Sequence, residues 1–140
     1  MSYYKLAAST TAHCLLGCGL GEVVGVLIGV SLGWATWQSI TLGVSLGFVF
    51  GFFLGILPLK KRGKTVKEAF KIIALGEVIS ISVMEATEVL IQIYTPGVMD
   101  AGFSDPILWF GMLLALTGGY IAAYPVNLLM IKKGVPRCCH

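Results

Sequence analysis

Four long apolar runs, separated by short polar stretches, organise the 140-residue chain. They cover residues about 12–34, 40–59, 70–94 and 107–131. Each run has about twenty residues or more, which as a helix crosses the roughly 30 Å hydrocarbon core of a bilayer. The pattern predicts an all-α integral membrane bundle of four transmembrane helices, which form a single domain over residues 1–140 and can be described as two tandem helical hairpins.

The composition supports a membrane location. The chain is 56% hydrophobic and 12% charged, and its mean hydropathy is +0.87. A soluble domain of this length cannot bury so much apolar surface. The segment before Ala12 has a single lysine and the apolar run after it is too long for the core of a signal peptide, so we expect no cleavable signal peptide.

The basic residues gather on one side of the predicted topology. The connections over residues 35–39 and 95–106 contain none, whereas the second of them contains Asp100 and Asp105. By the positive-inside rule this predicts a multi-pass protein of the cell membrane with both termini in the cytoplasm, and it places Trp34, Trp37, Tyr94 and Trp109 at the outer interface. The net charge of +3 fits this topology and attraction to anionic lipid, and it does not indicate nucleic-acid binding. All lysines and arginines lie at the amino terminus, in or beside the second connection, or in the tail: Lys5, Lys60, Lys61, Arg62, Lys64, Lys67, Lys71, Lys132, Lys133 and Arg137.

Candidate metal ligands stand at the beginning of the first apolar run. In a helix Cys14, Cys18 and Glu22 share one face because they are four residues apart, and His13 lies beside them. On the cytoplasmic side thiols stay reduced, which favours free or metal-bound cysteines over disulfides. Sulfur ligands select Cu(I) or Zn. We therefore predict a site for copper, or for another soft transition metal, at His13, Cys14 and Cys18.

The third apolar run carries three glutamates, Glu77, Glu85 and Glu88. A carboxylate inside a membrane is costly and by default marks a functional site. We predict that these glutamates and Glu22 relay ions or protons between the metal site and the outer face. The tetrapeptide Leu-Gly-Glu-Val surrounds both Glu22 and Glu77, which as a repeat places these two at similar depth. The alternative is that protonated glutamates are hydrogen-bonded to hydroxyl groups across the bundle.

Glycine recurs at every fourth position of the first two predicted helices. Small residues at this spacing let helix backbones approach closely in lipid. With the short connection at residues 35–39, the pattern predicts a tight antiparallel hairpin. The glycines are Gly17, Gly21, Gly25, Gly29 and Gly33 in the first helix, and Gly43, Gly47, Gly51 and Gly55 in the second.

The carboxyl-terminal residues Cys138, Cys139 and His140 form a second group of soft ligands. They could capture a soft metal and pass it on, or their occurrence in the tail could be accidental. The sequence leaves both interpretations open.

The signature His13-Cys14-x-x-Gly17-Cys18-x-x-Gly21-Glu22, together with a glutamate-bearing third helix, resembles a family of small four-helix membrane proteins known as domain of unknown function 4396. The resemblance covers nearly the whole chain. It implies the four-helix fold and no specific activity, with a loose suggestion of copper handling. The carboxyl-terminal cysteines and histidine are not part of the family pattern.

Two kinds of function fit these features. The first is a metal-handling protein, and because four helices enclose little volume it is expected to be a homo-oligomer in the lipid membrane. The second is a non-catalytic accessory subunit of a larger membrane complex, whose glycine faces and acidic residues pack against partner chains. The sequence has no nucleophile–base pair, phosphate-binding loop or cofactor signature, so we do not expect an enzyme.

Overall fold

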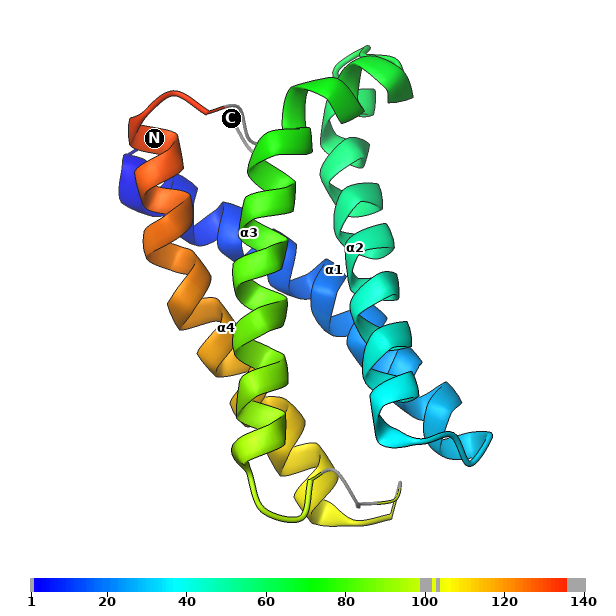
Figure 1. The fold of residues 1–140 in the computed structure, drawn as a ribbon. Coiled ribbons are helices and arrows are strands. Elements are labelled where there is room, and N and C mark those ends of the chain that lie inside the picture. The colour runs from blue at the N-terminus through cyan, green and yellow to red at the C-terminus, as the bar shows by residue number, and fades with distance from the viewer. Residues whose placement is uncertain (1, 99–101, 103, 136–140) are drawn as a thin grey trace.

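The computed structural model describes residues 2–98, 102 and 104–135, and in these ranges it contains four helices and no strand. Figure 1 shows α1 (Tyr3–Ser31), α2 (Thr36–Lys61), α3 (Val66–Tyr94) and α4 (Pro106–Lys132). The all-helical prediction is confirmed. Every helix begins before its apolar run, and α1 ends at Ser31, before the predicted limit at residue 34. Asp100, Cys138, Cys139 and His140 lie outside the described residues.

Local sequence signals mark the helix ends. The Thr65 hydroxyl accepts a hydrogen bond from the Glu68 amide, and the Glu68 carboxylate accepts one from the Thr65 amide, both at 3.2 Å, which forms a capping box at the start of α3. The Asp105 carboxylate caps α4 by accepting from the Ile107 amide at 3.2 Å. Glycines with positive φ, a conformation that other residues rarely adopt, follow three of the helices: Gly33, Gly63 and Gly134.

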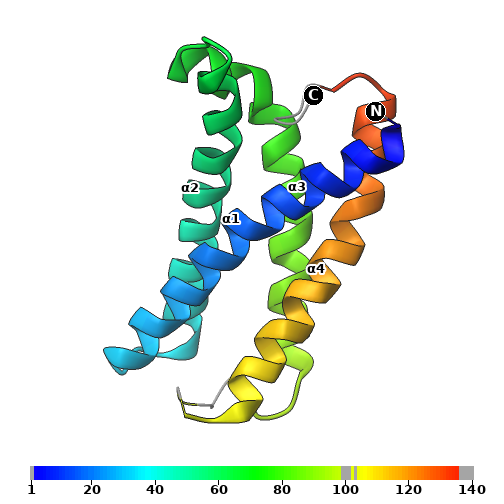
Figure 2. The ribbon, with the colours of Figure 1, turned by 180° about the vertical axis from the view of Figure 1, so that it is seen from behind.

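The helices run alternately up and down, so both ends of the described chain and the α2–α3 connection lie at the same end of the bundle (Figure 1). α1 contacts both α2 and α4, and α3 contacts the same two helices from the other side. Within the described ranges α2 and α4 make no substantial contact. α1 crosses the bundle obliquely, as seen from behind in Figure 2. The centre of the bundle therefore lies between the diagonal pair α1 and α3.

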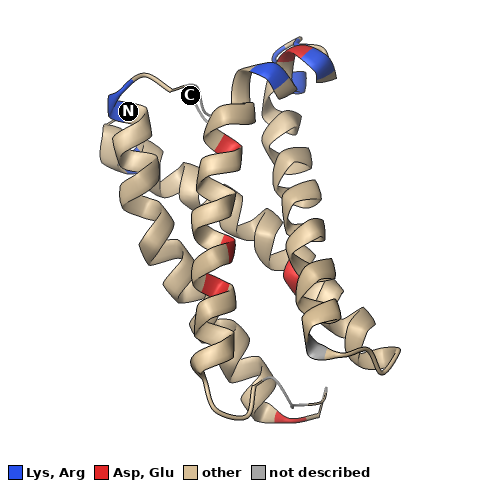
Figure 3. Cartoon of the chain, viewed as in Figure 1, with Lys and Arg blue, Asp and Glu red and all other residues tan. Residues whose placement is uncertain are grey.

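Charge is distributed unequally between the two ends (Figure 3). The described lysines and arginines gather at the end that holds the amino terminus, the α2–α3 connection and the last turn of α4. At the opposite end, where α1 and α3 finish and α2 and α4 begin, the exposed aromatic residues include Trp34, Trp37, Tyr94 and Trp109. We call these the basic end and the aromatic end.

Three helices, α1, α2 and α4, are long and apolar enough to cross a membrane, as expected of a membrane protein. α3 is less apolar because of its glutamates, but these side chains are buried. Its exposed face carries large apolar residues, among them Phe70, Leu75, Val78, Leu90 and Ile93. This distribution is the reverse of that on a surface helix in water, where polar residues face outward. Its buried polar residues are Glu77, Ser80, Glu85, Glu88 and Gln92.

The closest helix pair is α1 with α2, which meet through glycine. A methyl group placed on Gly17 would lie 2.7 Å from the Gly51 Cα atom. One and two turns along, methyl groups on Gly21 and Gly25 would overlap the backbones of Gly47 and Gly43. No side chain fits between the two backbones at these positions. This close contact sets the register of the first hairpin.

Candidate functional site

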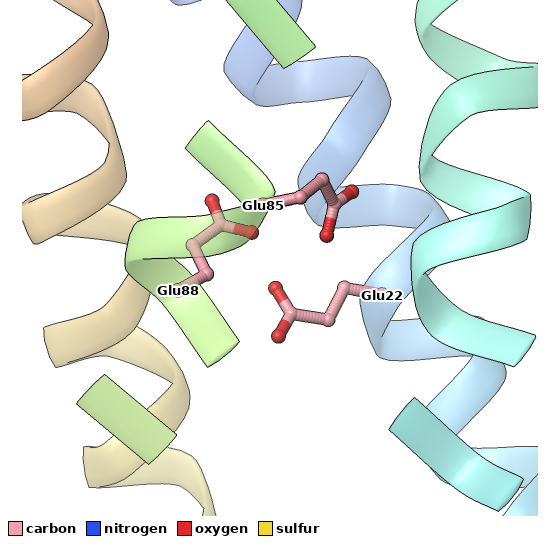
Figure 4. A group of neighbouring side chains, drawn as sticks. All are labelled: Glu22, Glu85 and Glu88. Carbon is pink, nitrogen blue, oxygen red and sulfur yellow. The ribbon is translucent and has the colours of Figure 1, made fainter. Parts of the chain in front are cut away.

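Three glutamates from two helices meet at the centre of the bundle. Glu22 comes from α1, and Glu85 and Glu88 come from successive turns of α3. Each offers a carboxylate oxygen, and these oxygens all lie within 4.8 Å of one another. Figure 4 shows the three carboxylates turned toward a common point between the helices. The three side chains are 4%, 3% and 0% exposed, so bulk water does not screen them. We refer to this group as the carboxylate cluster.

No basic side chain from the middle of the helices can neutralise this cluster. The sequence has no lysine or arginine between residues 6 and 59 or between 72 and 131. Within the described structure, Cys18 lies beside Glu85 and Glu22 lies beside Glu88, and no cationic side chain faces either carboxylate. Several ionised carboxylates at this spacing in a low-dielectric interior repel one another strongly. The cluster must therefore be neutralised by bound protons or by a bound cation.

Gln92 is a member of this site that the sequence analysis missed. Its side-chain amide donates a hydrogen bond to Oε1 of Glu22, and the Gln92 side chain is buried. The signal in the sequence is its spacing, because Gln92 lies one helical turn after Glu88 in an otherwise apolar stretch. This hydrogen bond joins the diagonal helices α1 and α3.

The two cysteines of α1 continue the polar interior toward the basic end. The Cys14 thiol donates a hydrogen bond to Oε2 of Glu77 at 3.4 Å. Cys18, one turn further along α1, is fully buried and lies next to Glu85. Neither of these two cysteines forms a disulfide. Polar side chains of α1 and α3 thus form a continuous series from Cys14 and Glu77 to the carboxylate cluster.

The surroundings of Glu22 and Glu77 differ from those that a repeat would give them. Glu22 lies against Glu85 and Glu88, whereas Glu77 lies against Cys14. The prediction of equal depth for Glu22 and Glu77 is therefore wrong. The neighbours of Glu22 in α1 and of Glu77 in α3 are thus not those expected of two copies of a symmetric repeat.

His13 points to a different place from the cysteines. Its Nε2 atom lies 2.6 Å from the backbone carbonyl of Leu54 in α2, and since a carbonyl can only accept, Nε2 donates. Pro58 lies four residues after Leu54 and has no amide hydrogen, so it cannot make the usual helical bond to that carbonyl. His13 supplies the missing donor. This contact gives His13 a structural role that the sequence analysis did not anticipate.

The structure does not assemble the expected ligand set of His13, Cys14 and Cys18. Among described histidine, cysteine, aspartate and glutamate side chains, the group close enough to hold a metal ion is the carboxylate cluster. Two of the hydroxyl groups expected as alternative partners of the glutamates, those of Thr87 and Tyr120, donate to backbone carbonyls instead. Thr87 donates to the Val83 carbonyl, and Tyr120 donates to the Ala8 carbonyl.

The two ends of the bundle differ in how they enclose the site. Toward the basic end the interior contains two further buried polar side chains, Asn127 and Thr11. Asn127 donates a hydrogen bond to Thr11 at 2.9 Å, and Thr11 donates one to the Ala7 carbonyl at 2.7 Å. Toward the aromatic end, an apolar layer contains Val26, Leu108 and Met112. The polar interior therefore extends further toward the basic end.

Comparison with known proteins identifies one family. The family described as a domain of unknown function (DUF4396) matches residues 3–135. No curated protein and no solved structure gives a significant match. Because the match covers nearly all of a chain with long apolar helices and a buried carboxylate cluster, this protein belongs to the DUF4396 family.

Proposed function

We propose that this protein is an integral membrane protein that binds a divalent transition-metal cation at Glu22, Glu85 and Glu88 in exchange for protons. The observation that carries the proposal is the convergence of three buried carboxylates, with no lysine or arginine in the middle of the helices to neutralise them. Buried charges are paired or coordinate metals. An intramembrane acidic group of this kind is a functional site by default.

Charge balance supports an exchange of ions at this site. With all three carboxyl groups protonated, the cluster is neutral and its burial in an apolar bundle is least costly. One divalent cation that replaces two protons leaves the net charge unchanged. Binding that releases fewer protons adds charge to the membrane interior, which costs free energy. We therefore expect about two protons to leave for each cation bound.

The donor atoms indicate which cations fit. Carboxylate oxygens suit ions such as Mn²⁺, and Zn²⁺ accepts oxygen as well as sulfur. Copper remains the second candidate, because the buried thiols Cys14 and Cys18 offer sulfur on adjacent turns beside the cluster. Capture of a soft metal by the tail residues Cys138, Cys139 and His140 stays one of the two interpretations that the sequence leaves open.

The path to the site is proposed from the distribution of polar groups. The buried polar side chains continue from the cluster to Thr11 and Asn127 near the basic end. If all four helices cross the membrane, the positive-inside rule places this end and both termini in the cytoplasm. Cations and protons then reach the cluster from the cytoplasm, and the intramembrane glutamates with Cys14 act as the relay.

A non-catalytic subunit of a larger membrane complex is the second candidate function. It is favoured by α2, which packs only against α1 and α3 in the described structure and leaves Val49 and Phe53 exposed. A second copy of the chain or a different membrane protein could cover this face. Under either function we expect the chain to be part of an oligomer.

Calorimetric titration of Zn²⁺ into purified protein in lipid nanodiscs tests the proposed function. Glu22→Gln, Glu85→Gln and Glu88→Gln should each weaken binding at least about 10-fold, because each removes a ligand charge. Glu68→Gln is the matched control, since Glu68 is an exposed glutamate on α3 outside the cluster. Titration in buffers with different ionisation enthalpies measures the protons released.

Two results would overturn this assignment. Wild-type affinity in all three cluster variants would remove the site from these carboxylates. Tight Cu(I) binding that disappears in Cys14→Ser/Cys18→Ser and persists in the cluster variants would move the metal to the thiols. Absence of metal binding, combined with isolation of the chain only in a larger complex, would favour the accessory subunit.

A further inference from the structure

Every glutamate inside the bundle lies against a glycine of a neighbouring helix. The glycines come from α2 and α4, which flank the diagonal pair α1 and α3. A methyl group built on each of these glycines would lie within 4 Å of the glutamate concerned. The pairs are Glu22 with Gly43, Glu77 with Gly55, Glu85 with Gly47, and Glu88 with Gly119.

In two of the four pairs an added methyl group would force the glutamate side chain to move. A methyl group on Gly47 would overlap Oε1 of Glu85 and lie 3.1 Å from its Cδ atom. A methyl group on Gly119 would lie 2.7 Å from Oε1 of Glu88 and 3.0 Å from its Cγ atom. Both glutamates are almost completely buried. The absence of a side chain at these glycines therefore leaves room for the two carboxylates.

Helix packing does not explain the missing side chain at Gly47. The close approach of α1 to α2 at this level is made by Gly21, whose added methyl group would overlap the Gly47 backbone. A methyl group on Gly47 itself would point to Glu85 and would come no closer to α1 than 3.6 Å, at the Cys18 Cα atom. An ordinary van der Waals contact of that length is tolerated.

We propose that Gly47 and Gly119 are positioning residues, which leave the space that lets Glu85 and Glu88 turn their carboxylates into the cluster. The proposal rests on the proposed function, since it concerns the same cation site. Protein interiors are close-packed, so one added methyl group must displace a neighbour. At these two positions the neighbour is a ligand carboxylate. The two glycines thereby act on the cation without contacting it.

Gly51 provides a matched control on the same face of α2. It lies one helical turn after Gly47, and a methyl group there would be 2.7 Å from the Ile81 Cδ1 atom and 3.9 Å from the Cys18 sulfur. Gly51→Ala therefore crowds an apolar side chain and leaves the carboxylates in place. Packing disturbance alone should affect Gly47→Ala and Gly51→Ala similarly.

The experiment compares Gly47→Ala, Gly51→Ala, Glu85→Asp and the double variant Gly47→Ala/Glu85→Asp by Zn²⁺ titration in nanodiscs. Gly47→Ala should lose about 10- to 100-fold in affinity, as do other changes that misplace a metal ligand. Gly51→Ala should stay close to wild type. Glu85→Asp alone should weaken binding, whereas in the Gly47→Ala background the shorter side chain makes room for the methyl group and should restore affinity, a non-additive result.

Infrared spectroscopy of the metal-free protein provides a readout that does not depend on cation binding. The carbonyl band of the protonated Glu85 carboxyl group is identified by its loss in Glu85→Gln. Gly47→Ala should shift this band and Gly51→Ala should leave it unchanged. Gly119→Ala, in α4 instead of α2, tests the same positioning role for Glu88. This second variant keeps the proposal testable if Gly47→Ala does not fold.

The possible outcomes separate this inference from the proposed function. Equal effects of Gly47→Ala and Gly51→Ala on Zn²⁺ affinity and on the infrared band, without rescue by Glu85→Asp, would overturn the positioning role and leave the cation site standing. If wild-type protein binds no Zn²⁺ while Gly47→Ala alone shifts the band, the cation site fails and the positioning of Glu85 by Gly47 is upheld.

Discussion

The two hairpins of this bundle use glycine in different ways. Between α1 and α2, glycines meet backbone against backbone, as Gly21 does with Gly47. Between α3 and α4, glycines of α4 receive side chains. Methyl groups on Gly118 and Gly119 would meet Ile91 in one case and Glu88 and Met84 in the other. The first arrangement tolerates no enlargement, whereas the second allows a flexible side chain to move. The first hairpin is therefore expected to be the more rigid one.

The difference affects the central site because α1 and α3 belong to different hairpins. Close contact with α2 fixes the height and rotation of α1, and so the positions of Cys14, Cys18 and Glu22. α3 contributes Glu77, Glu85 and Glu88 from a hairpin that packs through side chains. The carboxylate cluster thus lies between a tightly fixed helix and one whose surroundings are more adaptable.

The largest expected loss in the free energy of unfolding comes from a side chain placed between the backbones of α1 and α2. Gly21→Leu should lower the free energy of unfolding by about 3 kcal/mol or more, because the backbones themselves must separate. Gly118→Ala should cost at most about 1 kcal/mol, since the end of the Ile91 side chain can move aside. Denaturant unfolding in detergent measures both. Equal losses would abolish the distinction between the hairpins.

Removal of a polar contact in the first hairpin should lower the free energy of unfolding by an intermediate amount. His13→Ala leaves the Leu54 carbonyl without its donor and should cost about 1–3 kcal/mol of unfolding free energy. Cation affinity should be unchanged, because His13 is not close to the cluster. In a Pro58→Ala background residue 58 can donate to Leu54 again, so the same substitution should cost much less.

This double-mutant cycle decides between the two roles of His13. A positioning role through Leu54 predicts coupling between His13 and Pro58 and no effect on metal. Loss of metal binding in His13→Ala, with no coupling to Pro58, would restore His13 as a ligand and contradict the structural role.

The smallest change in the free energy of unfolding is expected at the contact between Cys14 and Glu77, where the two hairpins meet. Cys14→Ser keeps a donor for Glu77, so unfolding free energy should change by less than about 1 kcal/mol, within the usual net value of one hydrogen bond. Cys14→Ala removes the donor and should cost more. Zn²⁺ affinity at the carboxylate cluster should remain close to wild type in Cys14→Ser. A strong loss would show that the thiol is itself a metal ligand.

The amino-acid sequence was sufficient to predict the helical class and the elements. These elements depend on local signals, which can be recognised without knowledge of the fold. The signals are apolar runs of transmembrane length, helix caps such as Thr65 with Glu68, and glycines after the helices. The placement of lysines and arginines at the same end follows from helix lengths and alternating direction alone. The family, too, could be recognised from the sequence.

The partners inside the bundle were decided only by the tertiary structure. Which side chains meet between α1 and α3 depends on how far these helices slide and rotate, and one residue changes the direction of a side chain by about 100°. Glu22 lies against Glu85 and Glu88 instead of Glu77, a difference of eight residues or about 12 Å along α3. The pairing of His13 with Leu54 and the placement of glycine beside each glutamate depend on the same packing, because they join residues far apart in the chain. Sequence spacing within one helix predicts which residues share a face, but it contains no information on the neighbour that this face meets.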